Sequence, residues 1–240
     1  MRFVGSDEQE MVPVSRDQML EIDRIAVEET GPSLLQMMEN AGRSLAGLVV
    51  RHLHGDPPAA RVLVVAGKGG NGGGGICAAR HLSPRVGQVD LCLVDPDGLS
   101  PAAGSQLAIF RYTHRGETTL AALEPAPSYD LVVDAVIGYS LRGAPKGAAK
   151  EAIRRIGTMG ARVLSLDLPS GVDADTGQAP GVFVTAHGTL TLHLPKPGLR
   201  SPAAGKLWVA DLGIPAGVTR RVGIEPPGYG PGFVTSLERR

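Results

Sequence analysis

The chain has 240 residues, of which 42% are hydrophobic and 20% charged, a composition typical of a globular protein. Lysine plus arginine and aspartate plus glutamate number 24 each, so there is no net positive charge to favour nucleic-acid binding. No apolar run approaches the roughly 20 residues of a membrane-spanning helix, and residues 1–10 lack the apolar region of a secretory signal. Only two cysteines occur, without metal-ligand spacing. We therefore expect a soluble, cytoplasmic protein that binds neither nucleic acid nor membrane.

Two amphipathic helices are predicted in the first quarter of the chain. Apolar residues recur at helical spacing over residues 15–28 and again over about 33–53, with Gly31-Pro32 between the two segments. Ser15 is the expected N-cap of the first helix, and Gln18 three residues later would complete a capping box.

Strands and helices are predicted to alternate after residue 60. Apolar strands are expected at 62–66, 89–94, 131–136 and 163–168, and helices at about 76–82, 102–112 and 147–156. This alternation predicts a mostly parallel sheet with helices on both faces. Two further strands, 189–194 and 206–212, are expected to extend one sheet edge, and the last twenty or so residues to form a wrapping or frayed tail.

A run of glycines is the strongest local signal for a binding site. It spans Gly67 to Gly75, interrupted only by Lys68 and Asn71, and it directly follows the strand at 62–66. A strand that leads through glycines into a helix exposes backbone N–H groups to an anion, so phosphate or pyrophosphate is the expected ligand, with a merely tight turn as the alternative. The run is not a P-loop, because no Gly-Lys-Ser/Thr sequence follows.

Polar side chains also gather where other buried strands end. Asp167 and Ser170 follow one strand, at the position where open α/β sheets bind ligands, although such residues also simply close turns. Asp134 ends another strand, so Asn71, Asp134 and the pair Asp167 and Ser170 are expected to face one crevice. Their oxygen atoms suit an alkali or alkaline-earth cation better than zinc.

The sequence resembles the YjeF N-terminal domain family over about residues 15–215. The resemblance is carried by Ser15-Arg16-Asp17-Gln18-Met19 with Met38-Glu39-Asn40-Ala41-Gly42-Arg43, by residues 62–82, 134–138 and 167–177, by Lys196-Pro197-Gly198-Leu199, and by Asp211-Leu212-Gly213-Ile214-Pro215. It predicts one domain over residues 15–218, preceded by an extension at 1–14 and followed by a tail at 219–240.

The resemblance implies a three-layer α/β/α Rossmann-like sandwich with a mostly parallel central sheet. It further implies a homodimer that epimerises hydrated nicotinamide cofactors, R-NADHX and R-NADPHX, to their S forms in metabolite repair. In this family a potassium ion is held at the positions of Asn71, Asp134 and Ser170, and Asp167 faces the hydrated ring. Epimerisation requires a hydroxyl to leave and return, so Asp167 is the candidate catalytic acid/base.

The resemblance also implies a set of substrate contacts from Asp167 and two loop segments. These are Gly70, Asn71, Gly72, Gly73, Gly74, Gly138, Tyr139, Ser140, Leu141, Arg142, Gly143 and Ala144. The family pattern G-x-G-N-N-G-G-D-G has polar residues where this chain has Gly70 and Gly74, so a catalytically impaired nucleotide-binding or scaffold module is the alternative. Residues 213–240 are too few for the dehydratase domain fused to many bacterial members, so we expect any dehydratase partner to be a separate protein.

Overall fold

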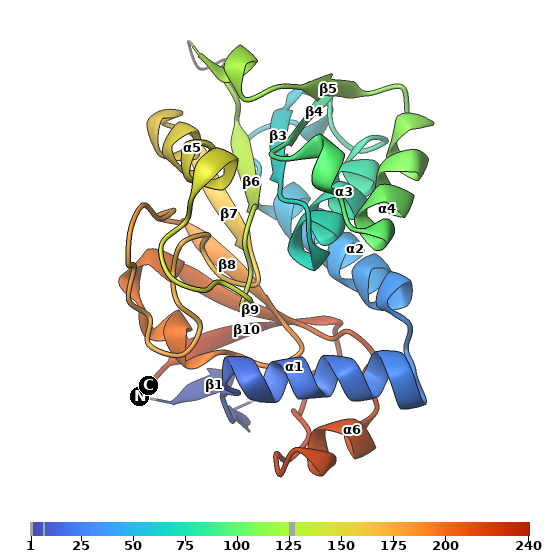
Figure 1. The fold of residues 1–240 in the computed structure, drawn as a ribbon, viewed down its shortest axis with the longest axis vertical. Coiled ribbons are helices and arrows are strands. Elements are labelled where there is room, and N and C mark those ends of the chain that lie inside the picture. The colour runs from blue at the N-terminus through green and yellow to red at the C-terminus, as the bar shows by residue number, and fades with distance from the viewer. Residues whose placement is uncertain (1, 7, 125–127) are drawn as a thin grey trace.

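A ten-stranded sheet runs through the computed structural model, which describes residues 2–6, 8–124 and 128–240 (Figure 1). Its strands are β1 (Phe3–Gly5), β2 (Glu10–Met11), β3 (Arg61–Ala66), β4 (Gln88–Leu93), β5 (Gly116–Thr118), β6 (Leu131–Ala135), β7 (Arg162–Leu166), β8 (Gly188–Leu192), β9 (Lys206–Ala210) and β10 (Val234–Arg239). They follow the order β2-β1-β10-β9-β8-β7-β6-β3-β4-β5. The block from β9 to β5 is parallel, as predicted, and the pairs involving β10, β1 and β2 are antiparallel.

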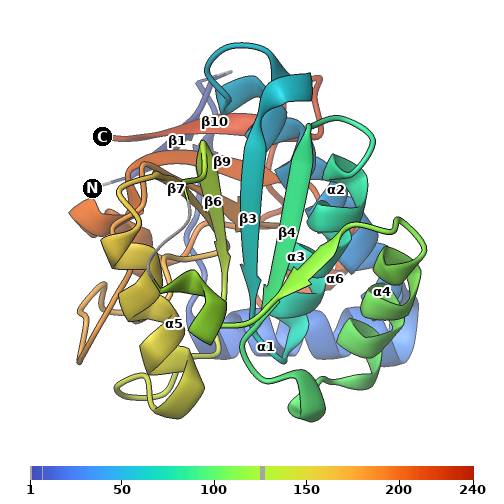
Figure 2. The ribbon, with the colours of Figure 1, turned by 90° about the horizontal axis from the view of Figure 1, so that it is seen from above.

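Helices cover both faces of the parallel block and produce the predicted three layers. They are α1 (Arg16–Ile25), α2 (Leu34–His52), α3 (Gly70–Leu82), α4 (Pro101–Arg111), α5 (Gly147–Thr158) and α6 (Ala216–Arg221). Figure 2 shows α5 on one side of β3 and β6, and α3 with α4 on the other. Among the described residues, no helix is both long enough and apolar enough to cross a bilayer.

The side chains of β3 explain why this strand is apolar at every position after Arg61. Val62 and Val64 pack into the core beneath α2, α3 and α4, whereas Leu63 and Val65 pack beneath α5. Successive strand residues point to opposite faces, so a strand covered on both sides needs a continuous apolar run. All four side chains are fully buried.

The two N-terminal helices begin where their capping residues predict. Ser15 Oγ accepts the Gln18 backbone N–H at 3.2 Å, while Gln18 Oε1 accepts the Ser15 N–H at 2.9 Å, which confirms the capping box. Ser33 and Gln36 form the same reciprocal pair at the start of α2. The first helix ends at Ile25, earlier than predicted, because the chain continues as a π-helical turn over Ala26–Thr30.

From Gly70 onward the glycine run is helical rather than a turn, which corrects the prediction for this part of the segment. Helix α3 begins at Gly70, well before its predicted start. A Cβ at Gly72 would lie 1.7 Å from the carbonyl oxygen of Gly67, and one at Gly75 would lie 2.4 Å from the Cβ of Ala135. The glycines therefore let the first turns of α3 pack directly against the β3 loop and against β6.

The two ends of the chain also differ from expectation, because both join the sheet. Within residues 219–240, predicted to wrap or fray, β10 pairs with β9 and β1, while residues 1–14 contribute β1 and β2. Strands β8 and β9 consequently lie inside the sheet rather than at its edge. In β10, Thr235 and Leu237 are buried while Ser236 and Glu238 are exposed, a two-residue period too short to stand out among the neighbouring prolines and glycines. The termini lie side by side in Figure 1.

The strand order creates a crevice at the carboxyl ends of β3 and β6. The chain runs outward from β3 to β4 and β5 and then returns to β6 on the other side of β3. The segments that leave β3 and β6 therefore diverge, which is the position where open α/β sheets bind ligands. The turn after β7, which contains Asp167, lies beside them.

Candidate active site

A cavity of about 470 Å³ lies at this crevice, between the carboxyl ends of the strands and helices α1 and α2. Seven of the predicted site residues line it: Gly70, Asn71, Gly74, Gly138, Tyr139, Ser140 and Asp167. The other predicted substrate contacts, Gly72, Gly73, Leu141, Arg142, Gly143 and Ala144, are not part of its lining. The structure thus gathers about half of the predicted set, and the role of each residue as a substrate contact stays a prediction.

Asp167 is held in one position at the floor of the cavity. It follows β7 with a φ of +67°, a left-handed conformation that costs energy for a residue other than glycine. Its Oδ1 accepts the ammonium of Lys196 at 2.6 Å, and its Oδ2 accepts the backbone N–H of Tyr139 at 2.8 Å. Only 2% of Asp167 is exposed, so its carboxylate contacts these partners rather than bulk water.

Lys196 is a site residue to which sequence analysis gave no role. Its side chain is fully buried, and its ammonium donates to Asp167 and to the carbonyl of Leu192 at 2.9 Å. The ammonium also lies 5.7 Å from the ring centroid of Tyr139. Lysine is almost never fully buried unless it is paired. The signal for it was a lysine within the apolar segment 194–199, directly after a buried strand.

Asp23 is a second carboxylate at the cavity that sequence analysis did not select. It is partly buried on α1, and its Oδ2 accepts the phenol of Tyr139 at 2.5 Å. Burial raises the pKa of Asp23 above its ordinary value, and the negative charge of Asp167 adds to the effect. The sequence did offer one signal for Asp23, namely a carboxylate one helical turn after Met19, on the apolar stripe of α1.

Asn71 has polar atoms that lack partners. Both Oδ1 and Nδ2 are buried without a hydrogen bond to any described residue. A Cβ at Gly138 would lie 3.2 Å from Asn71 Oδ1 and 2.9 Å from Asp167 Oδ2, so both side chains crowd this glycine. Buried polar atoms are rarely left unpaired, which marks Asn71 as a group that needs a ligand.

Asp134 and Ser170 are in direct contact beneath the cavity. Asp134 Oδ1 accepts the Ser170 hydroxyl at 2.5 Å, and Oδ2 accepts the Ser170 N–H and the Ser165 hydroxyl at 2.8 Å each. Burial raises the pKa of Asp134, and no basic side chain in the described part of the chain pairs with it. Hard oxygen donors and a buried carboxylate without a cation fit an alkali-metal ion. No hydrogen bond joins Asn71 to Asp134 or Ser170 within the described residues.

The two departures from the family pattern have different surroundings. A Cβ at Gly70 would meet nothing within 4 Å, so the cavity is open where the family carries an asparagine. At Gly74 a Cβ would lie 2.9 Å from Cδ2 of Leu166. Where the family has an aspartate, this chain therefore has a glycine against which the side chain of Leu166 packs.

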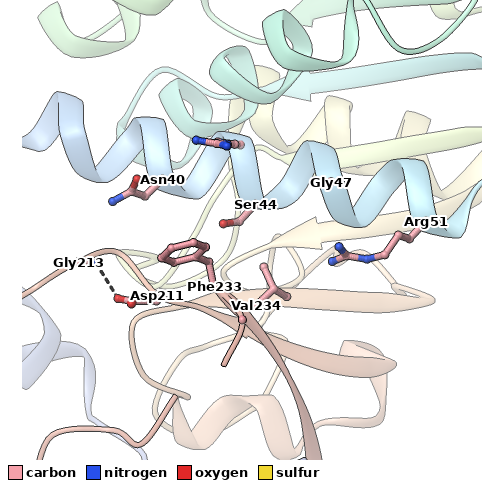
Figure 3. A pocket seen from close by; sticks show the side chains of 10 residues that line it. Asn40, Ser44, Gly47, Arg51, Asp211, Gly213, Phe233 and Val234 are labelled. Carbon is pink, nitrogen blue, oxygen red and sulfur yellow. Dashed lines mark hydrogen bonds between the residues drawn. The ribbon is translucent and has the colours of Figure 1, made fainter. Parts of the chain in front are cut away.

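A second cavity of about 370 Å³ contains none of the predicted site residues. It lies between α2 and the start of β10, where Ser44, Gly47 and Arg51 face Phe233 and Val234 (Figure 3). Its carboxylate, Asp211, accepts the backbone N–H of Gly213 at 2.7 Å. It lacks both a buried carboxylate–lysine pair and a helix N-terminus, so the first cavity is the better candidate for chemistry.

One other group of metal-ligating side chains lies outside both cavities. Glu39, Cys77 and His81 place one ligand atom each within 4.8 Å of one another on α2 and α3. The guanidinium of Arg80 already pairs with Glu39 and lies 3.3 Å from Cys77 Sγ. Burial raises the pKa of Cys77 to about 12, so its thiol is a poor ligand.

Comparison with known proteins agrees with this geometry. A family model described as "YjeF-related protein N-terminus" matches residues 34–198. The NAD(P)H-hydrate epimerase of Dehalogenimonas lykanthroporepellens is 48% identical over 225 residues, which are 94% of this chain and 91% of the relative. The bifunctional NAD(P)H-hydrate repair enzyme Nnr of Hyperthermus butylicus is 42% identical over 77% of this chain, but this chain spans 35% of that longer protein.

A solved structure shows the same fold. The crystal structure of the yeast protein ynu0 matches with a TM-score of 0.81 at 24% sequence identity, covering 95% of this chain and 100% of the yeast chain. The family model and the relative at 48% identity show that the chain belongs to the YjeF-related N-terminal family, as the sequence predicts.

Proposed function

We propose that this protein is an NAD(P)H-hydrate epimerase, an isomerase that converts R-NADHX and R-NADPHX into their S epimers. The observation that carries the proposal is the buried Asp167–Lys196 pair at the floor of a cavity that begins at the glycine-rich N-terminus of α3. A relative that is 48% identical over nearly its whole length and is named for this activity supports it.

The cavity offers suitable surroundings for both parts of such a substrate. Backbone N–H groups at the start of α3, from Gly70 onward, are oriented to bind the phosphates. Leu20, Val27 and Leu34 line the cavity and remain 39–46% exposed, which suits a planar ring. A dinucleotide would thus place its charged part on α3 and an apolar ring against α1 and α2.

Asp167 is the proposed acid/base for the reacting carbon. That carbon carries a hydroxyl next to the ring nitrogen, so epimerisation requires the hydroxyl to leave and a water to return on the other face. Lys196 and the N–H of Tyr139 each bind one carboxylate oxygen, which leaves the remaining lone pairs of Asp167 for a proton of the substrate or of water. Positioned proton transfer of this kind contributes about 10²–10⁴-fold to a rate.

The direct test uses both substrates in potassium buffer. Purified protein is incubated with R-NADHX or R-NADPHX, and formation of the S epimer is followed by chromatography against a no-protein control, because the epimers also interconvert spontaneously. We expect acceleration that disappears in Asp167→Asn while the thermal unfolding midpoint stays within a few degrees. If neither compound is converted faster than in the control, the protein is instead a nucleotide-binding or scaffold module.

We also propose that Asn71, Asp134 and Ser170 hold a potassium ion. Asn71 has unpaired buried atoms, and Asp134 is a buried carboxylate without a cationic partner among the described residues. When bound, the ion would supply positive charge that compensates Asp134 and orders the turns after β3 and β6. We expect the unfolding midpoint to be higher in KCl than in choline chloride at equal ionic strength, and this difference to vanish in Asp134→Asn. Equal midpoints in the two salts would contradict the site.

Three further properties are proposed on the basis of the family. The protein is expected to form a homodimer, so light scattering after gel filtration should give about twice the chain mass of 24.9 kDa. It is expected to act in the cytoplasm, where the cofactors are used. A separate dehydratase, which the resemblance to the family implies, is the expected consumer of the S epimer.

A further inference from the structure

Inversion at a ring carbon poses a geometric problem for a single carboxylate. Once the hydroxyl has left, the carbon is planar, and the incoming water must approach the face opposite to the one from which the hydroxyl departed. Asp167 is anchored at both oxygens, to Lys196 and to the N–H of Tyr139, so it has no freedom to move from one face to the other. A second proton-transfer group is needed on the other side of the ring.

Asp23 is a carboxylate in the right place for this task. It lines the same cavity but comes from α1, whereas Asp167 comes from the turn after β7. Tyr139 connects the two, because its backbone N–H bonds Asp167 at 2.8 Å and its phenol bonds Asp23 at 2.5 Å. The carboxylates of Asp23 and Asp167 therefore lie at the two ends of Tyr139, separated by the length of the tyrosine side chain.

The environment of Asp23 differs from that of Asp167. Asp167 has a buried lysine at 2.6 Å, which keeps it in an ion pair, while no basic group pairs with Asp23 among the described residues. Oδ2 of Asp23 accepts the Tyr139 phenol, and its Oδ1 has no hydrogen bond to a described residue. Burial and the charge of Asp167 raise the pKa of Asp23, while Tyr139 and Lys196 oppose this. Its raised pKa suits Asp23 to begin the reaction as the acid, which leaves the role of base to Asp167.

We infer that Asp23 is a second catalytic acid/base, which serves the face of the substrate ring opposite to Asp167. This inference rests on the proposed epimerase function. Two carboxyl groups on opposite sides of a carbon that becomes planar also operate in inverting glycoside hydrolysis, where one is the acid and the other activates water.

The step balances with these two groups alone. The Asp23 carboxylic acid gives its proton to the ring hydroxyl, the C–O bond breaks, and the lone pair of the ring nitrogen forms a C=N bond as water departs. A second water adds to the same carbon from the opposite face, the C=N electron pair returns to nitrogen, and the water's proton passes to Asp167. One water leaves and one enters, and the two carboxyl groups exchange protons with solvent before the next turnover.

Oxygen exchange separates this mechanism from one that uses a single carboxylate. R-NADHX and S-NADHX are incubated separately in H₂¹⁸O with wild type, Asp23→Asn, Asp167→Asn or Asp17→Asn. Incorporation of ¹⁸O into the ring hydroxyl is measured by mass spectrometry, and interconversion of epimers by chromatography. Asp17→Asn is the matched control, because Asp17 is an exposed carboxylate on the same helix, outside the cavity.

The expected result is a crossed pattern. Wild type and Asp17→Asn accelerate both exchange and inversion, whereas Asp23→Asn and Asp167→Asn lower the rate of inversion by at least about 100-fold. Each of these two variants retains one carboxyl group, which serves one face of the ring. Each variant therefore accelerates ¹⁸O exchange in one epimer only, and the epimer differs between the two variants. Circular dichroism and unfolding midpoints confirm that the variants are folded.

Two results would overturn the assignment of Asp23. Inversion by Asp23→Asn within about twofold of wild type would show that Asp23 is not needed. Loss of exchange in both epimers by folded Asp23→Asn would show that it acts only by positioning Asp167 through Tyr139. A wild-type protein that accelerates neither process would instead refute the proposed epimerase function itself.

Discussion

Two walls of the active-site cavity satisfy their polar groups in opposite ways. On the charged wall, formed by Asp23, Tyr139 and Asp167 and backed by the buried Lys196, each of these residues is bonded to another of the four. On the glycine wall, formed by Gly70, Asn71, Gly74 and Gly138, one position is open to solvent, and the single polar side chain has no partner among the described residues. The charged wall is thus organised by the protein alone, whereas the glycine wall is completed by what it binds.

This difference locates the stability of the site on the charged wall. Interactions on the charged wall exist without substrate, so removing Lys196 leaves the buried charge of Asp167 unpaired. The glycine wall contributes mainly close backbone packing and free N–H groups, so substitutions there affect binding and packing rather than charge. Variants on the two walls are therefore expected to differ in the size and in the kind of their effects.

The largest effect is expected for Lys196→Met on the charged wall. This variant leaves the Asp167 carboxylate buried without its ammonium partner at 2.6 Å, and breaking a buried pair costs about 3–5 kcal/mol of unfolding free energy. Urea unfolding measures the loss. The double variant Lys196→Met with Asp167→Asn should recover part of it, because the unpaired charge is then removed. A single variant within about 1 kcal/mol of wild type would show that water reaches the pair.

The second effect tests the junction of the two walls, where Gly138 lies between Asn71 and Asp167. In Gly138→Ala the new Cβ would lie 2.9 Å from Asp167 Oδ2, so the carboxylate must shift. We expect a cost of about 1–3 kcal/mol and a fall in the epimerisation rate of up to about 100-fold. Gly104→Ala in α4 is the control, since a Cβ there meets nothing within 4 Å. Unchanged activity in Gly138→Ala would mean that Asp167 tolerates displacement.

A third effect concerns His193, a buried histidine whose pKa is affected by burial and by the charge of Lys196. Burial, together with Lys196, lowers the pKa of His193 to about 3 from an ordinary 6.5. Between these values the unfolded chain binds a proton that the folded chain does not, so this histidine reduces stability as pH falls from 6.5 toward 3, by at most about 1.4 kcal/mol per pH unit. His193→Asn removes the group while suiting the φ of +62°.

Urea unfolding at several pH values checks this assignment. Wild type should lose stability faster than His193→Asn between pH 6.5 and 4.5, and the two should change in parallel above pH 7.5. Carboxylates titrate in both proteins, so the difference between the two curves isolates the histidine. Parallel curves over the whole range would show that His193 takes up a proton as readily in the folded protein as in the unfolded chain.

Periodicity predicted the elements of the fold well, but not their contacts. The alternation after residue 60 indicates the parallel block because each βα unit carries its own apolar pattern. Strand β10 did not stand out, because it is stabilised by pairing with β9 and β1 rather than by a long local pattern. The glycine run predicts a turn from propensity, but tertiary packing of α3 overrides that propensity.

The same limit applies to the candidate site. Asp134, Asp167 and Ser170 were selected because they follow apolar strands, and the structure places them at one end of the sheet. Lys196 and Asp23 were given no role, because their importance comes from partners far away in sequence, at 29 residues for Lys196–Asp167 and 116 for Asp23–Tyr139. Spacing along one chain carries no information about such pairs.

The smallest effect is expected for Gly70→Asn, which restores the polar residue of the family pattern on the glycine wall. The position is exposed at the first turn of α3 with nothing within 4 Å, and asparagine is a slightly better helix residue than glycine. We expect the unfolding midpoint to rise by about 1 °C and the KM for R-NADHX to fall by less than about tenfold.

Gly74→Asp is the informative partner of this variant, because its Cβ would meet Leu166 Cδ2 at 2.9 Å. We expect it to lower the unfolding midpoint even though it also restores a family residue. If Gly70→Asn were instead the more damaging change, the open space at position 70 would have to be required for the backbone itself to approach the substrate. The glycine wall would then be as strictly organised as the charged wall, by its backbone rather than by its side chains.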